Sequence, residues 1–238
     1  MNNNSLQEIN ERLIGQADQL YAGRGDVANI SKSIELLRNV ESDCYEIAWR
    51  LGRALFFAGQ ESQRGEVARR LHAEGVEAGR RAAKARSDRV EGHFWLGVNL
   101  ALLARFEPPT KAAARVLQAK QVLLRAIAID AAYHAAGPLR VLARLQHQLP
   151  RLLGGGVAKA RVNFERAIGI APANTVTRIY FAELLIAVGE TTRARAELEQ
   201  ILTVPFNPDW AFEIERDQRV AKEMIKKLSL PHFVNREP

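Results

Sequence analysis

The sequence predicts an all-α protein in which helical hairpins stack into a right-handed solenoid. Alanine, leucine, arginine and glutamate dominate a chain that is only 7% aromatic, and these side chains lose little rotamer freedom in a helix. One spacing of small and apolar residues recurs five times, and no segment alternates between apolar and polar residues as a strand does. We expect about five hairpins and a C-terminal capping helix in a single domain over residues 1–238, with flexible ends at residues 1–5 and 231–238.

The clearest copy of the recurring spacing is formed by Ala160, Phe164, Ala167 and Pro172. These offsets are those of the second helix of a tetratricopeptide repeat (TPR). The alanines let two helices approach closely, the phenylalanine fills the space between them, and the proline ends the helix because it has no backbone N–H. The segment therefore predicts the second half of a TPR hairpin.

Four other segments share this spacing. They are Ile30, Ile34 and Leu37; Gly75, Gly79 and Ala82; Ala119, Leu123 and Ala126; and Ala194, Leu198 and Ile201. The interval between copies shortens along the chain, and only the last one equals the usual TPR period of about 34 residues. We therefore expect a divergent array.

First helices are predicted by the Leu-Gly pairs at Leu51-Gly52 and Leu96-Gly97, since glycine admits a neighbouring helix and leucine packs beneath it. Helix-breaking residues separate the segments at Gly23–Asp26, Gly59–Ser62, Glu107–Thr110, Pro150–Gly156 and Gly189–Thr192. Thr110 and Thr191 are predicted as N-caps, and an amphipathic capping helix is predicted at about 209–228.

A binding groove is predicted on the concave side of the solenoid. In a TPR, certain positions of the first helix face this side. Applied here, that rule selects a larger set, from which we expect the groove to use Trp49, Arg53, Phe56, Phe94, Arg140, Arg144 and Glu183. Arginine and aromatic side chains often anchor protein interfaces, and arginine binds carboxylates through two hydrogen bonds. We expect a protein or peptide partner. The alternative is that the aromatic residues pack in the core and the arginines bond helix C-termini.

The charge leaves a second function open. With 34 basic and 27 acidic residues the net charge is +7, which favours anionic partners such as nucleic acid or another anionic surface. However, acids and bases are interleaved along the predicted helices, and the basic segment Arg80–Arg86 has no aromatic residue on which a base could stack. Nucleic acid is therefore the less favoured partner.

No pattern in the sequence indicates catalysis. The five histidines lack metal-binding spacing, Cys44 is the single cysteine, and the glycines at 154–156 lack the Gly-Lys-Ser/Thr of a phosphate-binding loop. We expect no enzyme activity, no metal and no cofactor.

The first twenty residues contain no apolar signal segment, and the most apolar stretch, Gly97–Ala104, is too short to span a membrane. The expected location is the cytoplasm, and the alternative is the periplasm if the N-terminus was trimmed.

Several segments go beyond a generic repeat. They are Gly137–Arg140, Pro150 with the glycines at 154–156, Ala182–Leu185, Pro208–Trp210, Glu215–Asp217 and Ala221. From about residue 85 to the C-terminus, their order resembles the T component of tripartite ATP-independent periplasmic (TRAP) transporters. This resemblance implies a non-enzymatic helper protein in the periplasm that docks to the transporter's substrate-binding component. It also implies a homo-oligomer with an apolar cleft or pore.

The N-terminal half carries a second resemblance. Its segments 17–21, 47–54 and 93–95 are similar to the regulator of microtubule dynamics proteins, which are also TPR proteins without known enzymatic chemistry.

Overall fold

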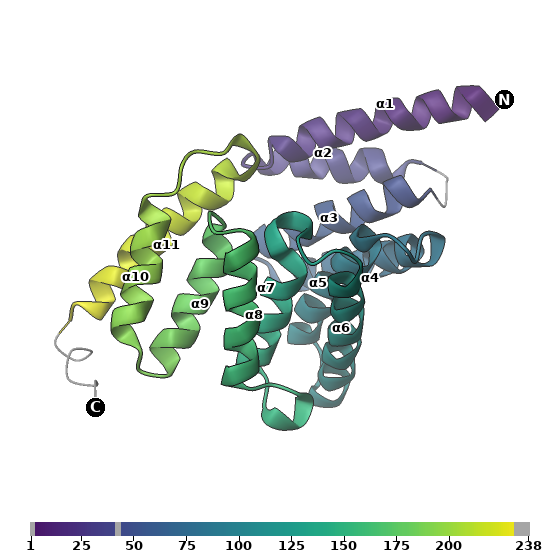
Figure 1. The fold of residues 1–238 in the computed structure, drawn as a ribbon. Coiled ribbons are helices and arrows are strands. Elements are labelled where there is room, and N and C mark those ends of the chain that lie inside the picture. The colour runs from purple at the N-terminus through teal and green to yellow at the C-terminus, as the bar shows by residue number, and fades with distance from the viewer. Residues whose placement is uncertain (1–2, 41–43, 231–238) are drawn as a thin grey trace. The chain divides into compact units, whose positions relative to one another are not determined.

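The structure is a computed structural model that describes residues 3–40 and 44–230, with side chains from residue 8 onward. Within these residues the chain forms eleven α-helices and three short 3₁₀-helices, and it forms no strand (Figure 1). The all-α prediction is confirmed. Residues 3–5 belong to the first helix, whereas residues 1–2 and 231–238 lie outside the described part, so the expected flexibility of both ends stays a prediction.

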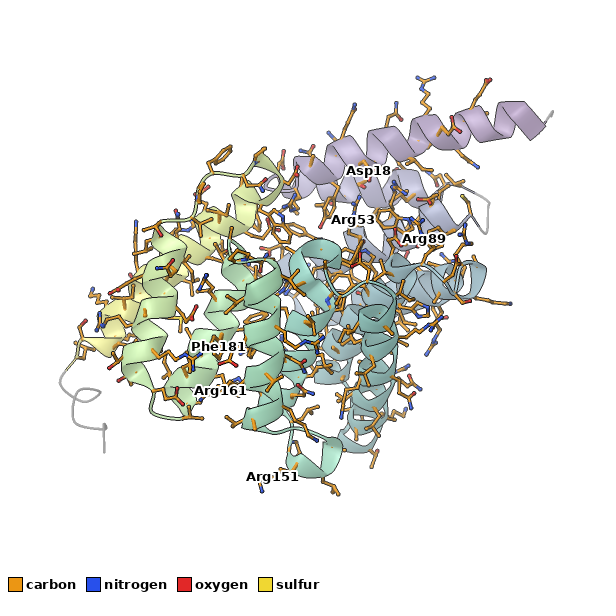
Figure 2. All side chains as sticks on the ribbon, in the orientation of Figure 1. Asp18, Arg53, Arg89, Arg151, Arg161 and Phe181 are labelled. Carbon is orange, nitrogen blue, oxygen red and sulfur yellow. The ribbon has the colours of Figure 1, made fainter. Side chains whose placement is uncertain are left out.

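The first compact unit, Met1–Ala131, contains three consecutive hairpins. Its elements are α1 (Asn3–Ala22), α2 (Val27–Arg38), α3 (Tyr45–Glu61), α4 (Gly65–Ala85), α5 (Val90–Leu103), η1 (Ala104–Phe106) and α6 (Pro109–Ile129). Each α-helix packs on the next, and α3 also packs on α5. An ion pair between Asp18 on α1 and Arg53 on α3 ties the first hairpin to the second (Figure 2).

The second compact unit, Ala132–Pro238, contains two hairpins and the C-terminal helix. Its elements are α7 (Tyr133–Gln148), η2 (Arg151–Leu153), α8 (Val157–Ile170), α9 (Thr175–Ala187), α10 (Thr191–Leu202), η3 (Pro208–Trp210) and α11 (Ala211–Leu228). The last helix packs on both α9 and α10. Five hairpins and a terminal helix are therefore present, as predicted, and α11 starts two residues after the expected position.

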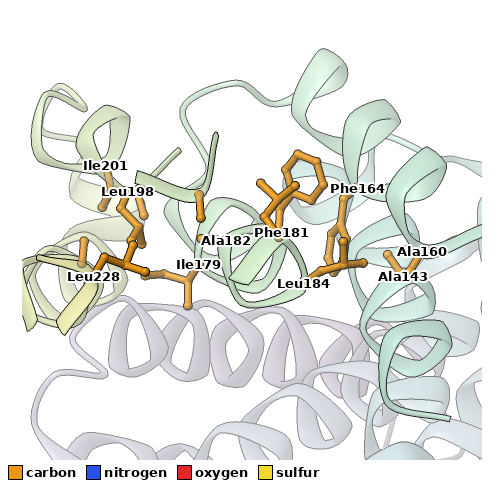
Figure 3. Close-up of a cluster of buried hydrophobic side chains, with 13 residues drawn as sticks. Ala143, Ala160, Phe164, Ile179, Phe181, Ala182, Leu184, Leu198, Ile201 and Leu228 are labelled. Atoms are coloured by element: carbon orange, nitrogen blue, oxygen red, sulfur yellow. The ribbon is translucent and has the colours of Figure 1, made fainter. Parts of the chain in front are cut away.

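The repeat spacing marks the residues that form the core. In the second unit Ala160, Phe164 and Ala167 of α8 are completely buried. Figure 3 shows the first two within a cluster of buried apolar side chains. The ring of Phe164 lies 5.7 Å from that of Phe181 on α9, so this pair joins the two hairpins of the unit. Aromatic pairs at this separation add to the stabilisation that burial alone provides.

The glycine-rich copy of the repeat has a steric explanation. A Cβ atom on Gly79 of α4 would lie 2.7 Å from the Leu96 Cα on α5, and one on Gly75 would lie 2.5 Å from the Asn99 side-chain oxygen. These distances are shorter than real Cβ contacts. At Gly79 the obstacle is the backbone of Leu96, so α4 and α5 cross too closely there for any side chain larger than hydrogen, whereas at Gly75 the obstacle is the Asn99 side chain.

Both N-cap predictions are wrong by one or two residues. Helix α6 begins one residue before Thr110, and its N-cap residue is Pro108. Helix α10 begins at Thr191 itself, and its N-cap residue is Glu190. Proline is favoured at the first helical position because its fixed φ suits a helix, and Pro109 therefore starts α6 ahead of Thr110. Side-chain capping occurs instead at Asp26 and Asn174, which accept backbone hydrogen bonds at the starts of α2 and α9.

A buried polar network crosses the middle of the first unit. His72 on α4 is 2% exposed, and its Nδ1 lies 3.1 Å from the Asn99 Oδ1 on α5. The Asn99 amide nitrogen donates to the carbonyls of Gly52 and Trp95, so its oxygen accepts and His72 Nδ1 donates. Burial lowers the pKa of His72, because the charged imidazolium would lose its hydration.

Replacing Phe164 with alanine should destabilise the second unit by about 3–5 kcal/mol, since a fully buried ring is lost and leaves a cavity. Val162→Ala on the same helix is the matched control, because that side chain is 54% exposed and should cost little. Urea unfolding followed by circular dichroism measures both. Equal effects of the two substitutions would contradict the packing described.

The His72 network should make stability depend on pH. Above the ordinary histidine pKa of 6.5 the ring is neutral in both states. Below pH 6.5 the unfolded chain takes up a proton on His72. The folded chain, in which the pKa of His72 is lowered, binds this proton only at lower pH. The free energy of unfolding therefore falls as the pH drops. Urea titrations between about pH 7.5 and pH 5 measure this slope. His72→Gln should reduce this slope and His93→Gln, at a partly exposed site, should not; a slope unchanged by His72→Gln would contradict the assignment.

Candidate functional site

The residues predicted for the groove fall into two sets. Trp49, Arg53, Phe56 and Phe94 belong to the first unit. Arg140, Arg144 and Glu183 belong to the second. Each set has its own surroundings within its unit, and these surroundings determine which side chains can reach a partner.

In the first unit, Arg50 and Arg53 stack on aromatic rings. The Arg53 Cζ lies 3.8 Å from the centroid of the Tyr21 ring and 5.0 Å from that of the Trp49 ring. The Arg50 Cζ lies 4.1 Å from the Trp49 centroid. A guanidinium over an aromatic face is attracted by the ring quadrupole. This arginine–aromatic cluster comprises Asp18, Tyr21, Glu46, Trp49, Arg50 and Arg53.

Carboxylates of the same cluster neutralise both arginines. Asp18 accepts hydrogen bonds from Arg50 (3.0 Å) and Arg53 (2.6 Å), and Glu46 accepts from Arg50 (2.6 Å). The arginine side chains are only 13% and 15% exposed, whereas those of Asp18 and Glu46 are 38% and 45% exposed. The cluster therefore presents carboxylates to its surroundings and holds its guanidinium groups beneath them.

The aromatic residues of this set pack in the core of the first unit. Phe94 is 2% exposed, and its ring lies 4.7 Å from that of the fully buried Trp95. Phe56 is partly buried, and the centre of its ring lies 5.5 Å from that of the same Trp95 ring. Trp49 is 8% exposed. A direct contact of these residues with a partner stays a prediction.

In the second unit, Arg144 and Glu183 form an ion pair between the first helices α7 and α9. The Arg144 Cζ lies 4.5 Å from the centroid of the Tyr180 ring. The side chain of His147, one turn further along α7, carries a buried Nδ1 that has no hydrogen-bond partner among the described residues. Burial and then the charge of Arg144 lower the pKa of His147. These four residues are called the inner-helix cluster, and it is open to solvent, since Arg144 and Glu183 are 24% and 35% exposed.

Arg140 has a different environment from Arg144, although one helical turn separates them. It is 5% exposed, and its Nη1 donates to the Ala135 carbonyl (2.9 Å) and to the Asn174 side chain (3.3 Å). Desolvation lowers the pKa of Arg140 to about 10, while the charges of Tyr180 and Asp217 oppose this shift. Its hydrogen bonds support the backbone of the unit.

The carbonyl that Arg140 binds belongs to a strained turn at the start of α7. His134, Ala135 and Ala136 have φ values of 51°, 53° and 58°, in the left-handed region. This conformation costs a non-glycine residue roughly 1–2 kcal/mol. A pocket of about 300 Å³ lies beside the turn, with a largely apolar wall that includes Ala135 and Trp210.

Sequence reasoning missed Asp18, Tyr21, Arg50 and Tyr180. The first two lie three residues apart on one predicted helix, so they share a face, but no groove position was assigned to that helix. Tyr180 lies three residues before Glu183, and its contact with Arg144 depends on how two helices cross.

The described residues contain no group of three or more histidine, cysteine, aspartate or glutamate side chains placed to hold a metal ion. Among the same residues, none of the helices combines the length and apolar character needed to cross a membrane.

Comparisons with known proteins identify the fold and the family. The family model of the TRAP transporter T-component matches residues 49–229, so the match begins well before residue 85. A crystal structure of a thermophilic TPR protein from Thermus thermophilus is similar in fold, with a TM-score of 0.64 and 19% sequence identity over 88% of this chain and 98% of that chain. The search of curated proteins gives no match, and these comparisons do not show the similarity to regulator of microtubule dynamics proteins. The fold is thus a TPR-like α-solenoid, and the chain belongs to the TRAP transporter T-component family.

Proposed function

We propose that the chain is a non-enzymatic scaffold of a TRAP transporter that binds the substrate-binding component through its inner-helix cluster. The observation that carries the proposal is the partly exposed ion pair of Arg144 and Glu183 over the Tyr180 ring. Both charges belong to first helices, which is where the TPR groove rule places partner-binding residues. The family match supplies the kind of transporter.

Arg144 of this pair is more exposed than Arg53 and Arg140, the other arginines of the predicted groove. Exposed ion pairs contribute roughly 0–1 kcal/mol to folding, and we expect a similarly small contribution from this partly exposed pair, so its partners can be exchanged at low cost. A carboxylate on the partner can take the place of Glu183, because a guanidinium binds carboxylates through two parallel hydrogen bonds. The Tyr180 ring then holds the guanidinium in place during the exchange.

The remaining predicted groove residues take a supporting part in this proposal. Trp49, Phe56 and Phe94 shape the first helices of the first unit, and Arg53 holds the exposed Asp18. Arg140 fixes the start of α7, from which Arg144 projects.

The family also supports a place of action and an assembly. We propose that the chain works in the periplasm as a homo-oligomer, because the resemblance to the T component implies both.

The alternative of a nucleic-acid binder gains nothing from the structure. Arg80 is paired with Glu77 on the surface of α4, and Arg86 with Asp88 directly after it. These pairs neutralise two of the four basic residues in Arg80–Arg86, the segment that was the best candidate for binding nucleic acid.

Arg144→Glu should weaken binding of the substrate-binding component of the same transporter by roughly tenfold, or about 1.4 kcal/mol, because it removes an arginine anchor and adds a repulsive charge. Arg193→Glu is the matched control, since Arg193 also forms a partly exposed ion pair but lies on the second helix α10. Isothermal titration calorimetry with the two purified proteins measures the effect, and far-ultraviolet circular dichroism confirms the fold. An affinity that Arg144→Glu leaves unchanged, or that Arg193→Glu weakens equally, would refute the assigned surface.

A further inference from the structure

The outward side of α6 carries an unusual stripe of apolar residues. Five residues on this side are exposed, and they follow one another at intervals of three and four: Ala114, Leu117, Gln121, Leu124 and Ala128. The two leucines are 45% and 54% exposed. The buried residues of the same helix point in nearly the opposite direction, toward α5: Val116, Ala119, Leu123 and Ala126.

This arrangement differs from that of an ordinary surface helix, which is apolar on its core side and polar on its solvent side. Helix α4 of the same unit follows the ordinary rule, since its outer side carries the pairs Glu66–Arg69 and Glu77–Arg80. Alternating steps of three and four residues are the spacing of a coiled-coil seam, in which the stripe of one helix packs against that of another. The outer stripe of α6 therefore fits a helix.

The charge of α6 indicates what kind of helix it fits. No aspartate or glutamate occurs between Pro109 and Ile129, and the four charged residues there are all basic: Lys111, Arg115, Lys120 and Arg125. At 3.6 residues per turn, Lys120 and Arg125 fall on opposite sides of the stripe. Arg115 lies on the core side and pairs with Glu107. Apart from Gln121, the stripe is thus apolar along its centre, and it has Lys120 at one edge and Arg125, which also donates to the Ser87 carbonyl, at the other.

We propose that the outer face of α6 is a docking site for an acidic amphipathic helix of a partner protein. That helix would carry leucine- or isoleucine-like side chains along its centre and aspartate or glutamate along both edges. The site lies in the first unit and uses none of the inner-helix cluster, so it is independent of the function proposed above.

Two other occupants fit the stripe less well. A contact of α6 with α6 of a second copy would place base against base, because this helix has no acid to offer in either orientation. An anionic membrane calls for a broad apolar face, often with bulky aromatic residues. The stripe has two large apolar side chains and no aromatic residue.

The test uses two synthetic helical peptides with the same leucine stripe, one edged with glutamate and the other with lysine, and the full-length chain. Fluorescence anisotropy should show binding of the glutamate peptide and little binding of the lysine peptide. Leu117→Gln/Leu124→Gln should reduce binding of the glutamate peptide at least about tenfold, because each leucine contributes burial of apolar surface. Lys120→Glu/Arg125→Glu should reverse the preference between the two peptides.

Matched controls lie on the exposed side of α8. Val162→Gln removes an equally exposed apolar side chain, and Lys159→Glu/Arg166→Glu makes the same charge change; neither should alter binding. The proposal is overturned if the two peptides bind alike, or if the α6 variants bind like the controls. It is also overturned if the α6 variants abolish self-association in sedimentation or binding to phosphatidylserine vesicles while peptide binding stays weak.

Discussion

The close approach of neighbouring helices is the constraint on which the rest of this structure depends. Where α4 crosses α5, the backbone of Leu96 occupies the space that a side chain at Gly79 would need. At the corresponding crossing of the second unit, alanines at 160 and 167 leave room for the Phe164 ring. Small residues at fixed intervals thus set the spacing of the helices, and the spacing decides which large side chains are buried and which reach the inner surface.

The same spacing explains why the arginines of the chain have such different roles. A guanidinium that reaches a gap between closely packed helices loses water and must be given partners there. Arg53 obtains a carboxylate and two aromatic rings, and Arg140 obtains a carbonyl and an amide oxygen. Arg144 lies one turn beyond Arg140, pairs with Glu183 and keeps part of its surface in solvent.

The helices could be predicted from the sequence because their pattern is local and repeated. Ala160, Phe164 and Ala167 indicate one buried face without any knowledge of the neighbouring helix. The candidate site could be predicted only in part. The groove rule selects Arg53 by its position on α3. Its partner Asp18 lies 35 residues earlier in the sequence, on α1, and no local pattern joins the two. Arg140 was placed on the inner surface by the same rule, which could not anticipate that a left-handed turn would bury it.

That turn also has a consequence for the order in which the second unit forms. A right-handed helix can grow by adding one residue at a time, but it cannot grow through three left-handed residues, none of which is glycine. The Ala135 carbonyl needs Arg140, and Arg140 needs Asn174, which lies 34 residues further along the chain. We therefore expect the start of α7 to reach its final conformation only after α9 has docked. The first residues of the second unit are then among the last to reach their final conformation.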